Sequence, residues 1–132
     1  MIQPTELRLG NYILHKVNNK IAMVKCTFQH FNLLSSGDSS TIFPVQLKGK
    51  ILDQSGFIEN TNYPLLPTAH EYILTIPVNG DNKNEIVAYI KSNNECFACA
   101  IVNGSIASNP VYHLHQLQNL YYSLTGNELK VE

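Results

Sequence analysis

Two cysteines and two histidines are the residues of this chain best suited to chemistry. Cys96 and Cys99 form a C-x-x-C pair in "ECFACAIV", and His113 and His115 follow in "VYHLHQLQ". Thiolates and imidazoles are the ligands of tetrahedral zinc, so Cys96, Cys99 and His113 are candidate metal ligands. The run around the cysteines alternates like a strand, which sends positions i and i+3 to opposite faces, and on a helix the two histidines would lie about 200° apart. We therefore expect structural cysteines and no metal or cofactor.

Motifs for other catalytic chemistries are missing from the sequence. It contains no G-x-S-x-G nucleophile elbow, no glycine-rich phosphate loop and no pair of carboxylates at helical spacing within a predicted helix. The stretch "NGDNKNE" (79–85) has the composition of a calcium loop, but it lacks the ligand spacing and the terminal glutamate. A hairpin turn explains it better. We therefore expect a protein that is not an enzyme.

The lysines of the first half indicate a different class of function, nucleic-acid binding. Residues 1–52 carry six lysines and arginines against two carboxylates, whereas residues 53–132 carry three against eight. Lysines on a small β-structure could follow a phosphate backbone while Tyr12, Phe28 or Phe31 stacks on bases. The candidate nucleic-acid surface consists of Lys16, Lys20, Lys25 and Lys48.

The overall composition fits one domain. A chain of 132 residues with 44% hydrophobic residues can bury one core and is too apolar for disorder. Only 14% of the residues are charged and 15 are asparagine, which favours self-association, and the net charge of −1 gives no overall attraction to nucleic acid or membranes. Three cysteines without a leader-like N-terminus predict reduced thiols and a cytoplasmic protein. No run reaches the length of a membrane span.

The first half of the sequence has the pattern of β-structure. Alternating apolar residues in "NYILHKV" and "KIAMVKCTF", joined by Asn18 and Asn19, predict a β-hairpin. We expect a third strand in "QHFNLLS" (29–35) and a fourth in "TIFPV" (41–45), where the proline confines the strand to an edge or an end.

A short helix and a second group of strands follow. Leu47, Ile51 and Leu52 share a helical face, and Gly56 predicts the end of that helix. An irregular, proline-containing connector over 58–70 leads to three further strands separated by asparagine-rich turns. These strands, "EYILTIPV", "EIVAYIKS" and "ECFACAIV", predict an antiparallel meander.

The segment "NPVYHLHQLQNLYYSLTGNEL" predicts a C-terminal helix. Asn109 is expected as its N-cap, Pro110 as its first residue and Gly126 as the residue that ends it. Its apolar side chains fall within one arc of about 120°, which predicts a stripe that packs on the core. This stripe consists of Leu114, Leu117, Leu120, Tyr121 and Leu124.

A polar face lies opposite the stripe on the same helix. We expect His115, Asn119 and Tyr122 to be exposed there, with Gln118 beside them. Tyrosine supplies contact area at little cost in entropy, and side-chain amides supply directional hydrogen bonds. This face is therefore the predicted surface for a protein partner or for self-association.

Three blocks of the sequence resemble a known group of proteins. The blocks are "ELRLGNYI", "FPVQLKGKILDQSGF" and "YHLHQLQNLYYSLTGNEL". They resemble, in the same order, the signature blocks of short uncharacterised proteins encoded in phages, prophages and mobile elements of Bacteroidetes-type bacteria. The resemblance implies a cytoplasmic, single-domain protein of mobile-element origin and carries no activity. This chain departs from the pattern by placing Leu114 between two histidines, which leaves the role of His113 open.

These observations predict an α+β fold in one domain, 1–132. An SH3-like half-barrel with a short helix (1–57) precedes an antiparallel β-meander packed by the C-terminal helix (58–132). The predicted function is that of a non-enzymatic binding or accessory module of phage or mobile-element origin. The alternative is a nucleic-acid-binding protein that uses its basic N-terminal half, and a third reading is a Cys/His metal protein.

Overall fold

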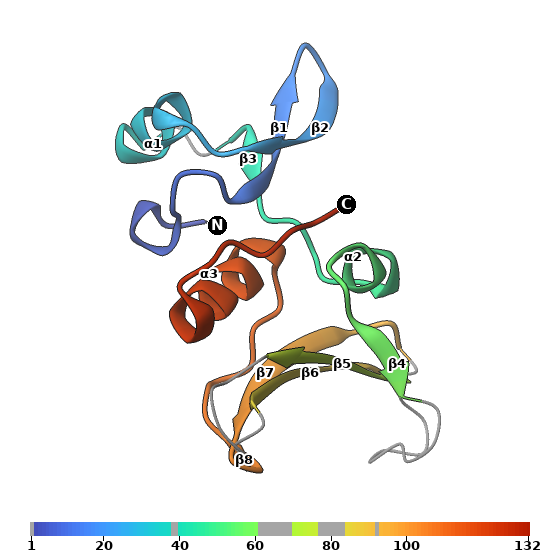
Figure 1. The fold of residues 1–132 in the computed structure, drawn as a ribbon. Helices are drawn as coiled ribbons and strands as arrows, with labels where there is room; N and C mark the ends of the chain where they lie inside the picture. The colour runs from blue at the N-terminus through green and yellow to red at the C-terminus, as the bar shows by residue number, and fades with distance from the viewer. Residues whose placement is uncertain (1, 38–39, 61–69, 77–83, 92) are drawn as a thin grey trace.

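The computed structural model describes residues 2–37, 40–60, 70–76, 84–91 and 93–132. The fold is α+β, as predicted, with two separate antiparallel sheets and three α-helices in these ranges. Two of the helices lie between the three-stranded N-terminal sheet and the five-stranded second sheet (Figure 1). None of the described helices has the length and apolar character that crossing a bilayer requires.

The predicted N-terminal hairpin is confirmed. Strands β1 (Tyr12–Val17) and β2 (Lys20–Lys25) pair antiparallel, and the turn residues Asn18 and Asn19 have φ angles of 52° and 62°. Asparagine tolerates this left-handed conformation better than most residues, which is why two residues suffice for the turn. Strand β3 (Ile42–Phe43) pairs with the middle of β1, so the strand order is β2-β1-β3.

A helix takes the place of the third predicted strand. The prediction of a strand over 29–35 is wrong, because helix α1 (Phe28–Ser35) occupies this segment. His30 and Leu34 are buried one helical turn apart, and the backbone N–H of Thr27 donates to Nδ1 of His30 at 2.9 Å where the helix begins. The sheet has three strands and does not close, so the SH3-like half-barrel is not confirmed.

Helix α2 (Gly49–Gln54) is short, as predicted. Ile51 and Leu52 are buried on its inner side, and Leu47 is buried just before it. Gly56 follows the helix with a φ of 88°, a conformation that glycine adopts without the steric cost of a side chain.

The second sheet contains the predicted meander and two further strands. Its strands are, in order, β4 (Ile58–Asn60), β5 (His70–Ile76), β6 (Asn84–Ile90), β7 (Cys96–Val102) and β8 (Ser105–Ile106). Strand β4 lies in the segment predicted as an irregular connector, where its pairing with β5 makes it an edge strand. The rest of that connector (61–69) and the turn residues 79–83 lie outside the described residues.

Helix α3 (Leu114–Thr125) begins later than predicted. Neither Asn109 nor Pro110 belongs to it, because Val111 still forms an antiparallel bridge with Ala98 of β7. The predicted apolar stripe and the end of the helix are confirmed, since Gly126 has a φ of 73°. The stripe residues that pack in or against the main core are Leu114, Leu117, Leu120, Tyr121 and Leu124.

The buried apolar side chains form two clusters, whereas one core was expected. The larger cluster lies among α2, α3 and the second sheet and draws on both predicted halves of the chain, from Val45 to Leu129. The smaller cluster includes Ile13 and Leu34 and lies among the N-terminal sheet, α1 and the 3-10 helix η1 (Pro4–Glu6). That 1–132 forms one domain stays a prediction.

Candidate functional site

The polar face of α3 is buried rather than exposed. His115 and Gln118 have relative exposures of 0% and 2%, Asn119 is half-buried, and Tyr122 alone of the four is exposed, at 43%. Residues 6–12 cover this face, and the helical angles of α3 alone could not reveal a segment so distant in sequence. The predicted exposure of the face is therefore wrong for His115 and Asn119, and Gln118 beside them is buried as well. Buried side chains of this kind are not available to a partner.

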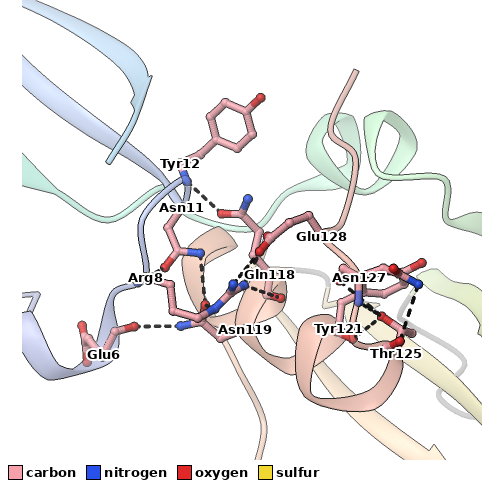
Figure 2. A network of polar contacts seen from close by, with 10 residues as sticks. All are labelled: Glu6, Arg8, Asn11, Tyr12, Gln118, Asn119, Tyr121, Thr125, Asn127 and Glu128. Carbon is pink, nitrogen blue, oxygen red and sulfur yellow. Dashed lines mark hydrogen bonds and ion pairs between the residues drawn. The ribbon is translucent and has the colours of Figure 1, made fainter. Parts of the chain in front are cut away.

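Asn119 is the centre of the contact between α3 and the N-terminal segment (Figure 2). Its Oδ1 accepts hydrogen bonds from Nε of Arg8 at 2.7 Å and from Nδ2 of Asn11 at 3.0 Å. Its Nδ2 donates to the backbone oxygen of Glu6 at 2.8 Å. Asn11 is fully buried, and its Oδ1 accepts the backbone N–H of Arg8 at 2.6 Å. Both polar atoms of the Asn119 side chain are thus hydrogen-bonded within the molecule.

Gln118 connects the same helix to the start of β1. Its Oε1 accepts the backbone N–H of Tyr12 at 2.8 Å, and its backbone oxygen accepts a bond from Nη2 of Arg8 at 3.3 Å. The Tyr12 amide points away from β2, and β3 does not extend far enough to pair with it. A buried amide without a hydrogen-bond partner is costly. Gln118 therefore completes the hydrogen bonding of the sheet. We call the contact of residues 6–12 with α3 and Glu128 the junction.

Arg8 closes the outer side of the junction. Its guanidinium pairs with the carboxylate of Glu128, and its Cζ lies 4.3 Å from the centroid of the Tyr122 ring. Stacking of a guanidinium on an aromatic face is favourable, and the two-oxygen pairing fixes its orientation. The exposed Tyr122 thus has an internal role as a platform for Arg8.

His115 lies at the inner end of the junction. Its Nε2 is 3.2 Å from Oε1 of Glu6, and its ring is parallel to that of His113, with centroids 5.8 Å apart. Burial lowers the pKa of His115 and outweighs the opposing effect of Glu6. A neutral imidazole that donates from Nε2 to the carboxylate fits this site. Its Nδ1 has no partner among the described residues.

The candidate metal ligands are not brought together. Cys96 packs in the main core, whereas Cys99 lies on the opposite face of β7. His113 precedes α3, so its ring stacks on His115 instead of lying about 200° away, as a helical position would require. Within the described part of the chain, no group of three or more His, Cys, Asp or Glu residues could hold a metal ion.

The two cysteines have the properties of buried core thiols. Burial raises the pKa of Cys96 to about 11 and also raises the pKa of Cys99. Both thiols therefore stay protonated at neutral pH, and a protonated thiol is a poor nucleophile and a poor metal ligand. This agrees with the structural role that the sequence predicted for them.

A second histidine pair, which sequence reasoning missed, joins α1 to β1. Nδ1 of His30 accepts the N–H of Thr27, so the ring proton of neutral His30 lies on Nε2. That Nε2 is 3.2 Å from Nδ1 of His15. Burial and the nearby His15 lower the pKa of His30. The spacing Thr27-x-x-His30, which resembles a capping box, was the available signal.

The predicted nucleic-acid lysines are all exposed, but they do not all lie on one surface. Lys16 and Lys25 lie on one face of the hairpin, whereas Lys20 lies on the other face because side chains alternate along a strand. Lys48 lies outside the hairpin, directly before α2.

The predicted stacking residues are also separated. Nζ of Lys25 lies 5.8 Å from the ring centroid of the half-buried Tyr12, Phe31 packs against the smaller core cluster, and Phe28 is exposed on α1. The structure therefore does not assemble the basic and aromatic residues of the N-terminal half into one continuous track.

One face of the hairpin exposes large apolar side chains. We call it the hairpin face and define it as Leu14, Lys16, Ile21, Met23, Lys25 and Phe43. The relative exposures of Ile21, Met23 and Phe43 are 59%, 41% and 38%. None of the ion pairs among the described residues involves a lysine of this face. The face therefore presents apolar contact area beside unpaired positive charge.

A groove of about 400 Å³ continues the hairpin face toward α2. It contains two lysines and no carboxylate, and about half of its lining residues are apolar. The groove is lined by Leu14, Met23, Pro44, Val45, Gln46, Lys48, Lys50, Ile51 and Gln54.

Comparisons with known proteins do not point to a function for this chain. No family model, no curated protein and no solved structure matches it. The functional assignment therefore depends on the geometry of the hairpin face and its groove.

Proposed function

We propose that this chain is a non-enzymatic protein-binding module that holds its partner on the hairpin face and in the adjoining groove. The observation that supports this is the exposure of Ile21 and Met23 on β2 and of Phe43 on β3 on the same face of one small sheet, with Leu14 of β1 between the two strands. Single exposed apolar residues are normal, but a contiguous apolar patch marks an interaction surface. The centre of a protein interface is apolar and its rim is polar or charged, which is the arrangement of this face.

The charges around the face favour an acidic partner. Lys16 and Lys25 flank the apolar residues, and Lys48 and Lys50 line the groove. Complementary charge speeds association and suppresses wrong partners. The module would therefore select a partner surface that is apolar at its centre and acidic at its margin.

The sequence resemblance supports a role as an accessory protein of a phage or mobile element that acts in the cytoplasm. The first and last resembling blocks contain residues 6–13 and 112–129, which are the two sides of the junction. The resemblance thus supports a common scaffold. Binding specificity resides elsewhere, on the hairpin.

Nucleic-acid binding is the second candidate function, because Lys16, Lys25 and the exposed Phe43 lie on the same face. Two features favour a protein instead. Ile21 and Met23 occupy most of the exposed apolar part of this face, and aliphatic side chains do not stack on bases as aromatic rings do. Lys20 also projects to the opposite side, away from any shared track.

Selection of random displayed peptides against the immobilised protein tests the proposal. Peptides that bind should shift the backbone amide signals of the hairpin face and of the groove in two-dimensional NMR spectra. The double variant Ile21→Thr, Met23→Thr should lose most of this binding. The matched control is Ile106→Thr, which removes an equally apolar side chain, 74% exposed, from the other sheet and should leave binding unchanged.

Two results would overturn the proposal. One is a set of selected peptides that map to other surfaces or bind the double variant as well as the unaltered protein. The other is a single-stranded oligonucleotide that shifts the same amides, with an affinity that falls steeply as salt is added. That second result would establish the nucleic-acid alternative.

A further inference from the structure

We propose that the partner binds by adding a strand to the free edge of β2, and that this strand is an extended acidic segment whose apolar and acidic residues alternate. The inference rests on the proposed function and specifies its binding mode and the chemistry of the partner. Three observations support it: the direction of the backbone groups of β2, the side chains beside them, and the charges at its ends.

The hydrogen-bond pattern of the hairpin identifies which backbone groups face outward. The N–H of Cys26 donates to the oxygen of Asn11 at 2.7 Å, so Cys26 and every second residue before it point toward β1. On β1, the N–H of Lys16 turns away from β2 and donates to Thr41 at 2.8 Å. Lys16 is paired with Ile21, and in such a pair the backbone N–H and C=O groups of both residues point away from the partner strand. Ile21 and every second residue after it on β2 therefore direct these groups away from β1.

The outward-facing residues of β2 are Ile21, Met23 and Lys25. Each directs its N–H and its C=O to the open side of the sheet, since β2 is an edge strand and pairs only with β1 among the described residues. The hairpin also extends beyond the rest of the molecule, and β2 forms its outer side (Figure 1). An unpaired row of donors and acceptors is a template for another strand.

The side chains beside this edge fit an alternating segment. Ile21 and Met23 lie on the hairpin face, where apolar residues of the added strand would pack against them at the spacing of paired strands. Lys25 lies on the same face, and Lys20 lies on the other face at the opposite end of β2. Because the acidic residues of an alternating segment lie opposite its apolar residues, they would share the face of Lys20 and meet it, while Lys25 adds positive charge at the far end of the strand.

The charges also decide between an acidic segment and a second copy of this chain. Residues 12–27 contain three lysines and no carboxylate. Two β2 edges brought together would accumulate lysines at one interface, and like charges on neighbouring strands are destabilising. Lysine on an edge strand is a common protection against self-pairing. An acidic segment turns the same charges into attraction.

A peptide of alternating valine and glutamate serves as the probe, and hydrogen exchange of single amides is the measurement. Binding should slow exchange of the Ile21 and Met23 amides, which face outward in the free protein. Exchange at Ala22 and Val24 should change little, because their amides already bond to β1. A peptide of the same composition in shuffled order, and one of alternating valine and lysine, are the matched controls and should not protect Ile21 or Met23.

Backbone methylation of the probe separates strand addition from docking of side chains alone. Two peptides carry N-methyl groups on alternate residues, in opposite phase, so that only one of them keeps its donors on the side facing β2. Strand addition predicts that one binds like the parent and that the other binds at least about tenfold more weakly. Equal binding of the two would overturn the strand mode while leaving the proposed binding face intact.

Charge reversal tests the acidic preference. The variant Lys20→Glu, Lys25→Glu should weaken binding of the valine–glutamate peptide about tenfold and improve that of the valine–lysine peptide. Lys91→Glu, on an exposed lysine that pairs with Glu95 on the other sheet, should change neither. Failure of the reversal to exchange the two preferences would overturn the acidic assignment. Concentration-dependent protection of Ile21 and Met23 without peptide would instead show that the edge pairs with a second copy.

Discussion

The junction and the hairpin face both carry polar and charged side chains, but in opposite states. In the junction the amides of Asn11 and Asn119 bond within the molecule, and the charge of Arg8 meets Glu128. On the hairpin face Lys16 and Lys25 have no carboxylate partner among the described residues, and the outer edge of β2 carries no ladder. The polar groups of the junction are thus bonded within the molecule, whereas the lysines of the hairpin face and the outer edge of β2 are open to solvent.

The difference separates residues that build this fold from residues that can recognise something. Histidines, amides and tyrosines concentrated on one helix face suggest a site, yet here they connect two parts of one chain. Isoleucine, methionine and lysine in an ordinary strand pattern do not suggest a binding site, yet on the hairpin these side chains are exposed. A substitution should therefore cost stability in the junction and binding on the hairpin.

The largest expected effect is that of Asn119→Ala. The substitution removes the hydrogen-bond partner of Nδ2 of the buried Asn11, the side-chain contact to the Glu6 carbonyl and the bond from Arg8, so we expect a loss of about 3 kcal/mol in the free energy of unfolding. Urea titration measures it. Ser123→Ala, on the exposed side of the same helix, is the control and should cost less than about 0.5 kcal/mol. A loss as small as that of the control would mean that the junction is not structural.

Arg8→Ala should have the next largest effect, about 1.5 kcal/mol at low salt, because its ion pair is partly exposed and screened. Arg8→Lys should recover only a small part of the loss, since an ammonium group cannot bond to Asn119 and Glu128 while stacking on Tyr122. The salt dependence of unfolding measured for both variants checks this. Full recovery by lysine would show that charge alone matters at this position.

A smaller effect is expected from acid. The folded state lowers the pKa of His30 below the value of about 6.5 in an unfolded chain, so the unfolded state takes up the proton first. This contribution to stability is full above pH 6.5 and is lost as the pH falls toward the lower pKa of the folded state. His113 and His115, whose pKa values are also lowered, act in the same direction.

The variant His30→Gln isolates the contribution of His30. Glutamine at this position can still accept the N–H of Thr27, as Gln116 accepts that of His113, but it does not titrate. Urea midpoints measured from pH 8 to pH 5 should fall less steeply in the variant. An unchanged slope would assign the acid sensitivity to His113 and His115.

The smallest effect on stability is expected on the hairpin face. Ile21→Thr with Met23→Thr keeps strand propensity and shortens two side chains that are about half exposed and belong to neither core cluster, so the free energy of unfolding should change by less than about 1 kcal/mol. The same urea titration applies. A loss comparable to that of Asn119→Ala would show that the hairpin face belongs to the core and would remove the basis of the proposed binding surface.

Local patterns predicted the elements whose signals lie close together in the sequence. Asn18 and Asn19 are enough to turn the hairpin, and Gly56 and Gly126 end α2 and α3 where the backbone needs a positive φ. The α1 segment was misread because its short apolar run fits either a strand or a helix. Burial of His30 and Leu34 one turn apart decided between them.

The candidate site was harder to predict than the elements. The helical angles of α3 identify the stripe that packs on the core, but they contain no information about a covering segment 106 to 113 residues away. The exposed edge of β2 could not be predicted from the sequence either. The alternating pattern identifies a strand, but it does not show whether that strand lies at the edge or in the centre of a sheet. Both facts depend on which distant segments meet.

The long sequence separation of the junction has a consequence for the order in which the chain is made. Arg8 and Asn119 are 111 residues apart. At typical rates of translation, of about 5 to 20 residues per second, Arg8 waits on the order of ten seconds for its partner to be synthesised. The hairpin and α1, which have their own small cluster, can assemble on the ribosome during that time. A nascent chain would thus present the β2 edge before α3 exists to anchor the sheet that carries it.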